Sequence, residues 1–342
     1  MKAVVIGGTG FLGLNLVEAL RASGHEVVAT RRKSSNTIFL RRMKVPMLAA
    51  SLDDEESLVA AMKGSEVAFF AAAHYPRLSL DTEAQVAQAV AQTRHVLAAA
   101  RRASIRRLVY TGSVVTVARP PTDRPAVETD GTPAVAPEGS TYYAVKLALE
   151  REVLSARDLE VVEVLPTGCF GPYDHKVGTG FFVVALAHGR LAAFVDGRIN
   201  VVDARDVALA HIGAALEGRP GERYILGGHD IVVSDFLSQI SRCVGVPVAA
   251  RKLGADEAMR LATAEEARCQ GTPERPALSR EIVDMAVHGQ FVDSGKAIRE
   301  LGFAPRLLGA TLSDSVDWYR RNGYIPQLRE GDNHGGRSQA GV

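Results

Sequence analysis

Short runs of β-branched and aliphatic residues alternate with longer helical patterns along the first half of the chain. Strands that alternate with helices form right-handed βαβ units, so this order predicts a parallel sheet with helices on both faces. The predicted strands are Ala3–Gly7, Glu26–Thr30, Pro46–Ala49, Val67–Ala72, Arg107–Thr111 and Glu160–Leu165. The predicted helices span residues 11–22, 54–63, 83–103 and 140–156.

The alternation of strands and helices becomes less regular after residue 166 and returns once, at 198–218. We therefore predict an α/β fold: a Rossmann-type doubly wound parallel sheet with a smaller, interleaved C-terminal substrate domain. The dinucleotide-binding domain is expected to span 1–166, with 198–218 returning to it. The substrate-binding part is expected to comprise 167–197 and 219–328.

Composition narrows the classes of protein that this chain can belong to. With 342 residues, 46% of them hydrophobic and 23% charged, it has the composition of a globular protein. A net charge of +1 gives no field that favours nucleic acid or an anionic membrane. The three cysteines are widely separated, so neither a disulfide framework nor a metal site is expected.

The two ends of the chain and the length of its apolar runs allow further predictions. The N-terminus enters an apolar strand directly, without the apolar core and cleavage site of a signal peptide. No apolar run reaches the ~18 residues that a membrane span needs, so we expect a cytoplasmic protein without a membrane partner. Residues 329–342 lack apolar periodicity and are predicted to form a disordered tail.

A glycine-rich turn, "GGTGFLG", joins the first predicted strand to the first helix. Gly7 permits a tight turn, Gly10 lets the backbone approach a pyrophosphate, and Gly13 allows the helix to pack on the strand. The helix directs its free N–H groups and positive dipole end at the anion. The turn therefore predicts a dinucleotide site, which the intervening residues of the turn are also expected to contact: Thr9, Phe11 and Leu12.

The second predicted strand ends in a basic run, "TRRK", at residues 30–33. NAD sites usually place Asp or Glu here to bind the ribose 2′-hydroxyl, whereas a guanidinium can bind a 2′-phosphate through two hydrogen bonds. Arg31 and Arg32 are therefore predicted to bind that phosphate. The expected cofactor is NADP(H), with NAD(H) as the alternative.

Two adjacent tyrosines precede a lysine in "STYYAVK", residues 140–146. On a helix, Tyr142 lies four residues before Lys146 and Tyr143 lies three before it, so either ring can approach the ammonium group. Successive helical residues diverge by about 100°, so only one tyrosine can face a given point. Helical geometry alone leaves the choice between them open.

These features together resemble the extended, and related atypical, short-chain dehydrogenase/reductases over residues 1–325. The motifs that carry the resemblance are "GGTGFLG", "RLVYTGS", "STYYAVK", "GCFGP", "VVDARDVALAH" and "GERYILGG". Within that superfamily the chain is similar to the NAD-dependent epimerase/dehydratase family, in its dihydroflavonol-4-reductase-like and hopanoid-associated sugar epimerase-like branch. The catalytic Ser-Tyr-Lys set of the family falls on Ser113, Tyr142 and Lys146, and the family spacing selects Tyr142 over Tyr143.

The resemblance implies a role for each of these three residues. Ser113 holds the carbonyl oxygen, Tyr142 protonates it while the cofactor delivers hydride, and Lys146 also binds the nicotinamide-ribose hydroxyls. A cation ~4 Å from a phenol is worth up to about 4 kcal/mol, or roughly three pKa units. Lys146 and the oxidised nicotinamide are therefore expected to bring the pKa of Tyr142 to about 7.

The resemblance also implies contacts outside the catalytic set. Further cofactor contacts are expected at or near the ends of three strands: Ser51, Leu52, Ala72, Ala73, Pro166 and Gly168. Contacts with a small-molecule carbonyl substrate are expected from His74, Tyr143, Tyr173 and His175. A homodimer through the helices at 83–103 and 140–156 is implied as well.

The residues that follow Ser113 bear on the reaction. Sugar-nucleotide dehydratases of this superfamily carry an Asp-Glu pair there, but Val114 and Val115 cannot transfer protons. The Val-Tyr-Gly motif of many epimerases is also missing. With the basic strand end, this favours an NAD(P)H-dependent oxidoreductase that reduces a ketone or aldehyde of a small organic metabolite to an alcohol. The alternatives are a nucleotide-sugar epimerase that uses bound NAD and a non-catalytic NADP-binding redox sensor, against which the intact Ser-Tyr-Lys set argues.

Overall fold

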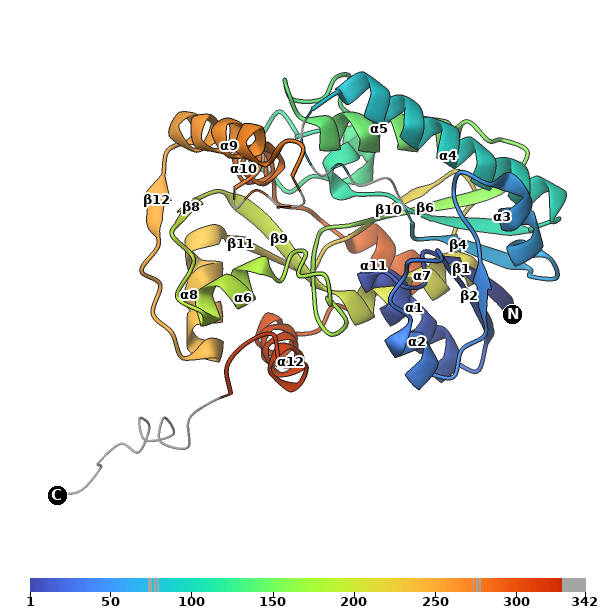
Figure 1. Cartoon of the computed structure of the whole chain (residues 1–342). Helices are drawn as coiled ribbons and strands as arrows, with labels where there is room; N and C mark the ends of the chain where they lie inside the picture. The colour runs from blue at the N-terminus through green and yellow to red at the C-terminus, as the bar shows by residue number, and fades with distance from the viewer. Residues whose placement is uncertain are drawn as a thin grey trace.

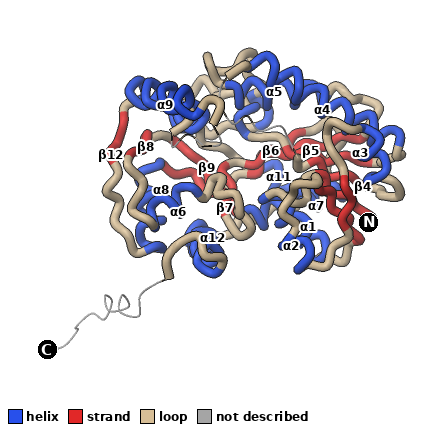
Figure 2. Tube along the Cα trace, viewed as in Figure 1, coloured by secondary structure: helices blue, strands red, loops and turns tan. Residues whose placement is uncertain are grey.

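A seven-stranded parallel sheet forms the larger part of the protein in this computed structural model, which describes residues 1–327 except 73–75, 77, 79, 273, 275 and 277 (Figures 1 and 2). The strand order is β10-β6-β5-β4-β1-β2-β3, so the chain proceeds outward in opposite directions from β1 and β4. Ligands of doubly wound sheets bind beyond the carboxyl ends of the strands at such a switch point. The strands are β1 (Lys2–Ile6), β2 (Glu26–Arg31), β3 (Met47–Ala49), β4 (Val67–Phe70), β5 (Arg107–Thr111), β6 (Glu160–Pro166) and β10 (Arg223–Leu226).

Helices cover both faces of this sheet (Figure 1). One face packs on α1 (Phe11–Ala22), α7 (Ala204–Leu216) and α11 (Gly295–Leu301). The other packs on α3 (Glu55–Met62), α4 (Thr82–Arg102) and α5 (Thr141–Leu154). Every residue of β4 and β5 is buried, as expected for central strands covered on both faces. No helix within the described residues combines the length and apolar character needed to cross a membrane.

The predicted elements of the first half are confirmed, because each observed end lies within two residues of the predicted one. One α-helix that the structure describes in this region was not predicted, the five-residue α2 (Ile38–Arg42) between β2 and β3. The predicted doubly wound sheet is confirmed as well. The predicted tail, 329–342, lies outside the described residues.

As far as the chain is described, the smaller part of the protein contains two short sheets and five α-helices (Figure 2). Its strands are β7 (Gly168–Phe170), β8 (Ala193–Val195), β9 (Arg198–Asp203), β11 (His229–Val232) and β12 (Arg251–Leu253). Its helices are α6 (Phe181–Ala187), α8 (Val233–Val244), α9 (Ala255–Cys269), α10 (Arg280–Val287) and α12 (Leu308–Arg321).

Sheet membership differs from the predicted division of the chain at two strands. β9, expected to return to the dinucleotide-binding domain, pairs with β7 and β11 in the smaller part. β10, expected in the substrate-binding part, pairs in parallel with β6 at the edge of the large sheet. Pairing with β10 gives β6 a hydrogen-bonding partner on the edge that does not pair with β5.

Aromatic side chains connect the two parts. Phe39 of α2 packs on Tyr173 at 5.4 Å and on Trp318 of α12 at 5.9 Å, measured between ring centres. Trp318 also stacks on Tyr324, with ring centres 5.5 Å apart. The helix that follows the basic end of β2 is therefore in direct contact with the C-terminal helix.

Candidate active site

The glycine-rich segment that joins β1 to α1 has no space for a side chain at Gly7 or at Gly13, the third residue of α1. Gly7 has φ of 93°, and a Cβ there would lie 2.8 Å from the backbone nitrogen of Ala72. A Cβ on Gly13 would lie 2.2 Å from the carbonyl oxygen of Gly7, which also accepts a hydrogen bond from the nitrogen of Gly10 at 2.9 Å. Gly10 precedes α1 without a side-chain cap, and the first turn of α1 has no acidic residue. The first N–H groups of α1 therefore suit the pyrophosphate of a dinucleotide.

Two hydroxyl residues that the sequence did not single out hold this loop. Thr30 Oγ1 at the end of β2 accepts a hydrogen bond from the nitrogen of Gly7 at 3.1 Å. Ser35 Oγ accepts one from the nitrogen of Arg32 at 3.0 Å and one from Thr9 Oγ1 at 3.4 Å. The loop is thereby fixed to the basic segment that follows β2. The other predicted contacts in the loop, Phe11 and Leu12, are half-buried in the first turn of α1.

The two arginines predicted to bind the 2′-phosphate lie at the carboxyl end of β2. Arg31 is half-buried and Arg32 is exposed. Within the described part of the chain, neither guanidinium forms an ion pair with a carboxylate. Both charges therefore remain available to an anion at this edge of the sheet.

The other predicted cofactor residues lie at or just beyond the carboxyl ends of neighbouring strands. Ser51 and Leu52 follow β3, Ala72 follows β4, and Pro166 ends β6, with Gly168 two positions further on. The Ser51 hydroxyl accepts a hydrogen bond from the nitrogen of Asp53 at 3.2 Å, so it shapes the turn before α3. Two more predicted residues, Ala73 and His74, lie outside the described residues.

The predicted catalytic residues lie together where β5 and α5 meet. Ser113 follows β5 and begins a short 3₁₀ helix, η1 (Val114–Thr116), while Tyr142 is in the first turn of α5. Ser113 Oγ and Tyr142 Oη are 3.2 Å apart, and both side chains are buried. Lys146, one turn further along α5, is also buried, with Nζ 6.0 Å from the centre of the Tyr142 ring.

Comparison with known proteins gives the family of this chain. Residues 3–227 match the NAD-dependent epimerase/dehydratase family. This chain belongs to that family. It is therefore an NAD(P)-dependent enzyme of the extended short-chain dehydrogenase/reductase superfamily, an oxidoreductase whose relatives act on small molecules.

Three similar proteins carry names that refer to reductases or to an epimerase. A protein from Synechocystis with the provisional name dihydroflavonol 4-reductase is 32% identical over 94% of this chain and 95% of its own length. A ketoreductase from Stigmatella aurantiaca, named for a 3-oxo-farnesyl-dihydroquinoline oxide, is 30% identical over 94% of this chain and 97% of its own. A crystal structure from Pseudomonas aeruginosa, named a nucleoside-diphosphate-sugar epimerase, is 31% identical with a TM-score of 0.81, covering 95% of this chain and 99% of its own.

In this member of the epimerase/dehydratase family, the two adjacent tyrosines, Tyr142 and Tyr143, have different surroundings. The two rings meet at 85° with their centres 6.1 Å apart, and His288, just after α10, lies 6.5 Å beyond Tyr143. The hydroxyl of Ser113 forms its hydrogen bond with Tyr142. Tertiary structure therefore distinguishes the two tyrosines where helical spacing does not.

The pKa values of the catalytic pair are governed by burial. Burial raises the pKa of Tyr142; Glu281 of α10 adds to the rise, and the hydrogen bond with Ser113 opposes it. Burial lowers the pKa of Lys146 from 10.5 to about 8, against the charges of Glu163 and Glu281. Without the cofactor, the pKa of Tyr142 is therefore shifted away from the expected value of about 7, because burial disfavours the phenolate. That expectation includes the oxidised nicotinamide and stays a prediction.

Tyr173 and His175 follow β7 on the side of the molecule that faces α1, α2 and α12. Tyr173 Oη donates a hydrogen bond to Glu18 at 2.8 Å, and both rings pack near Phe39. These contacts join elements of the two parts rather than the Ser113–Tyr142 pair. Substrate binding by Tyr173 and His175 stays a prediction.

Proposed function

We propose that this enzyme reduces a ketone or aldehyde of a small organic molecule to an alcohol. The observation that carries the proposal is the buried pair of hydroxyls, Ser113 Oγ and Tyr142 Oη, 3.2 Å apart. Two hydroxyls at this spacing can hydrogen-bond one carbonyl oxygen from two directions. A bound nicotinamide cofactor would supply the hydride.

Three side chains of the protein carry out the remaining steps: Ser113, Tyr142 and Lys146. Ser113 holds the carbonyl oxygen in place, and Tyr142 transfers its phenolic proton to that oxygen as negative charge develops there. The raised pKa of Tyr142 keeps the phenol protonated at neutral pH, which suits a proton donor. The Lys146 ammonium stabilises the tyrosinate that results and would hold the ribose hydroxyls of a bound cofactor.

NADPH is the cofactor that we infer for this reduction. The support is the basic end of β2, where Arg31 and Arg32 have no carboxylate partner among the described residues and Ser35 ties the segment to the glycine loop. A 2′-phosphate between these guanidinium groups would form charged hydrogen bonds. NADH, lacking that phosphate, would bind more weakly.

The smaller part of the protein is proposed to bind the substrate, because it supplies residues beside the catalytic pair. Glu281 of α10 acts electrostatically on Tyr142, Tyr143 and Lys146, and His288 contacts Tyr143. A substrate held over Tyr142 would therefore also meet α10. Variation in this helix would change which carbonyl compound is accepted.

A homodimer is proposed through the outer surfaces of α4 and α5, which lie side by side in Figure 1. Both helices expose alanines there, and small side chains allow helices of two copies to pack closely. The alanines are Ala84, Ala87 and Ala91, which are exposed, and Ala144 and Ala148, which are half-buried. Light scattering that gives a monomer mass at micromolar protein would contradict the dimer.

A nucleotide-sugar epimerase is the second candidate. It is supported by the relative of known structure that is named a nucleoside-diphosphate-sugar epimerase and is 31% identical. An epimerase returns its bound cofactor to the starting redox state, whereas a reductase consumes NADPH. Val114 and Val115, next to Ser113, offer no further acid–base group for either reaction.

The test is net oxidation of NADPH by the purified enzyme with a panel of ketones and aldehydes. We expect loss of NADPH absorbance matched by an equal amount of alcohol, identified by chromatography. Inversion of one centre of a nucleotide sugar with the cofactor unchanged would favour the epimerase instead. Tight NADPH binding without turnover of any compound would point to a cofactor sensor.

A further inference from the structure

A row of polar side chains lies on the sheet face that α5 covers, and Tyr142 and Lys146 are buried residues of that helix. Tyr110 of β5 is paired in register with Glu163 of β6, and Glu163 with Arg223 of β10. Residues in register on neighbouring strands point to the same face of a sheet. Tyr110 and Glu163 are completely buried.

The Glu163 carboxyl lies against the backbone that leads into the catalytic serine. A Cβ on Gly112, the residue before Ser113, would lie 2.2 Å from Glu163 Oε1. Among the described residues, neither Glu163 oxygen has a hydrogen-bond donor, and the Tyr110 hydroxyl has no partner either. A buried carboxylate without donors is strongly disfavoured, so the acid form is favoured in the resting protein.

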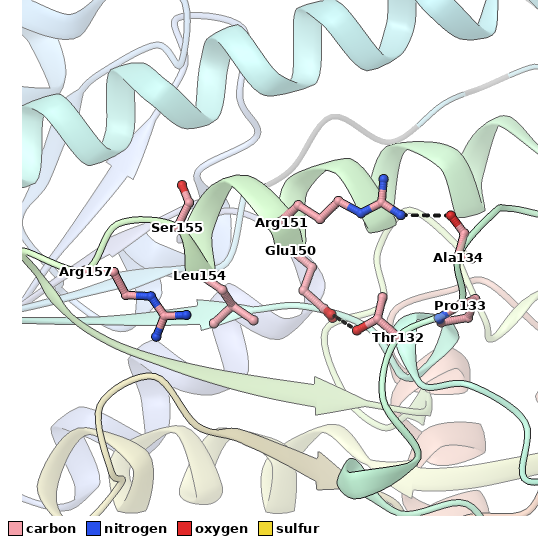
Figure 3. A pocket seen from close by; sticks show the side chains of 8 residues that line it. All are labelled: Thr132, Pro133, Ala134, Glu150, Arg151, Leu154, Ser155 and Arg157. Carbon is pink, nitrogen blue, oxygen red and sulfur yellow. Dashed lines mark hydrogen bonds between the residues drawn. The ribbon is translucent and has the colours of Figure 1, made fainter.

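Of the two cations near Glu163, Arg223 has an ion-pair partner and Lys146 has none within the described residues. Arg223 forms an ion pair with Glu150 of α5 at 2.8 Å, and the Thr132 hydroxyl donates to the same carboxylate at 2.7 Å. Figure 3 shows Glu150 and Thr132 lining a surface hollow beside α5. Lys146, one turn before Glu150, forms no ion pair within the described part of the chain.

Burial and the charge of Glu150 raise the pKa of Glu163 well above its usual range, against Arg223 and Lys146. In turn, the Glu163 charge opposes the burial that lowers the pKa of Lys146. The two buried groups therefore titrate as a coupled pair. The charges that act on this pair come from β10, α5 and α10: Arg223, Glu150 and Glu281. The phenols of Tyr110 and Tyr142 are its titratable neighbours, Tyr110 beside Glu163 and Tyr142 beside Lys146.

We propose that Glu163 is a positioning residue that keeps Lys146 charged as pH rises. In the resting protein its carboxyl holds a proton, and Lys146 carries the charge that faces Tyr142. When the pH rises and the carboxyl loses its proton to solvent, the carboxylate that forms stabilises the ammonium. The kinetic consequence rests on the reductase function proposed above, whereas the charge states do not.

Nuclear magnetic resonance titration of the lysine side chains tests this without turnover, with Lys146→Met to assign the signal. Glu163→Gln preserves the shape of the side chain and removes its charge, so the Lys146 pKa should fall by about one unit below that of the wild type. Glu163→Asp should stay near the wild type. Glu160→Gln is the matched control, because Glu160 lies on the same strand but pairs with Arg107, and it should leave the Lys146 pKa unchanged.

Two further measurements decide the outcome. The infrared band of a protonated carboxyl should be present in the wild type at pH 7 and missing in Glu163→Gln. If the variant does not fold, titration of this band in the wild type shows whether the buried carboxyl is protonated at neutral pH. In the pH profile of kcat, the basic limb of Glu163→Gln should move to lower pH by the same unit. An unchanged Lys146 pKa, or no such band, would overturn the proposal. If the Lys146 pKa shifts but no carbonyl compound is reduced, the reductase function fails and the role of Glu163 stands.

Discussion

The hydroxyl oxygens of Ser113 and Tyr142 lie 3.2 Å apart although 29 positions separate these residues along the chain. β5 brings one hydroxyl to the carboxyl edge of the sheet and the first turn of α5 brings the other. Both side chains are buried, so their positions are fixed by packing. The reacting oxygen of a substrate would therefore meet two donors whose geometry exists before it binds.

Replacing Tyr142 by phenylalanine should remove the proton donor and leave the ring packing intact. General acid catalysis contributes about 10²–10⁴-fold, so kcat for NADPH-dependent carbonyl reduction should fall by that factor in Tyr142→Phe. The affinity for NADPH, measured by fluorescence titration, should stay near that of the wild type. Ser113→Ala should give a similar loss of kcat.

Replacing Tyr143 by phenylalanine is the matched control, since it removes the same hydroxyl one position further along α5. Tyr143 contacts His288 and Tyr142 through its ring, so Tyr143→Phe should retain most of kcat and change KM at most. The two variants should be compared under identical steady-state conditions. Inactive Tyr143→Phe with active Tyr142→Phe would reverse the assignment.

Replacing Arg32 by alanine should weaken the binding of NADPH more than that of NADH. A hydrogen bond to a charged group is worth about 1.5–3 kcal/mol, which corresponds to roughly a 10- to 150-fold loss of affinity in Arg32→Ala. Isothermal titration with each cofactor measures this. Arg41→Ala, an exposed arginine on α2, should affect neither cofactor. Equal losses for NADPH and NADH in Arg32→Ala would argue against a contact with the 2′-phosphate.

Replacing Gly13 by alanine should disrupt the glycine loop. The new Cβ would lie 2.2 Å from the carbonyl oxygen of Gly7, so the loop and α1 must move apart. Such overpacking costs about 1–3 kcal/mol of unfolding free energy, and NADPH affinity should fall at least about tenfold. Gly309→Ala in α12 meets open space and should leave both unchanged. Thermal unfolding and cofactor titration of the two variants give the comparison.

Lys146 should make the folded protein more stable at high pH than at neutral pH. Its pKa is about 8 in the folded state against 10.5 for an exposed lysine, so between these values the unfolded chain binds one more proton. Stability therefore rises with pH across this window, by about 3 kcal/mol in all. Lys146→Met should be more stable than the wild type at pH 7, and the difference should shrink between pH 8 and 10.5. A difference in urea unfolding that is independent of pH would contradict the buried charge.

The large sheet and the glycine loop could be predicted because their signals are local. β5, "RLVYT", has an apolar and aromatic centre and is buried throughout, and Gly10 and Gly13 are constrained by the backbone of Gly7, three and six residues before them. α2 could not be predicted, because five residues are too few to show helical periodicity. The position of β10 beside β6 could not be predicted either, because the residues of a four-residue strand do not indicate which strand it pairs with.

Part of the candidate site could likewise be predicted from the sequence, and part of it could not. Lys146 and both tyrosines were found from spacing, but Tyr142 is separated from Tyr143 in the structure by a hydrogen bond to Ser113 that sequence spacing does not show. Glu163 was missed because β6 is buried on both faces, so the polar–apolar alternation that marks a solvent-facing position does not apply. Its burial, and the raised pKa of Tyr142, depend on neighbours from other strands and helices.

Trp318 is the only tryptophan in the chain, and its ring lies 5.9 Å from that of Phe39, on the helix that follows the basic end of β2. Its side chain is buried between α12 and the larger part of the protein. Tryptophan emission depends on the polarity around the indole, so this enzyme contains a built-in fluorescent reporter of the contact between its two parts. Cofactor binding that moves α2 relative to α12 can thus be followed in solution, without a label, by the wavelength of that single emitter.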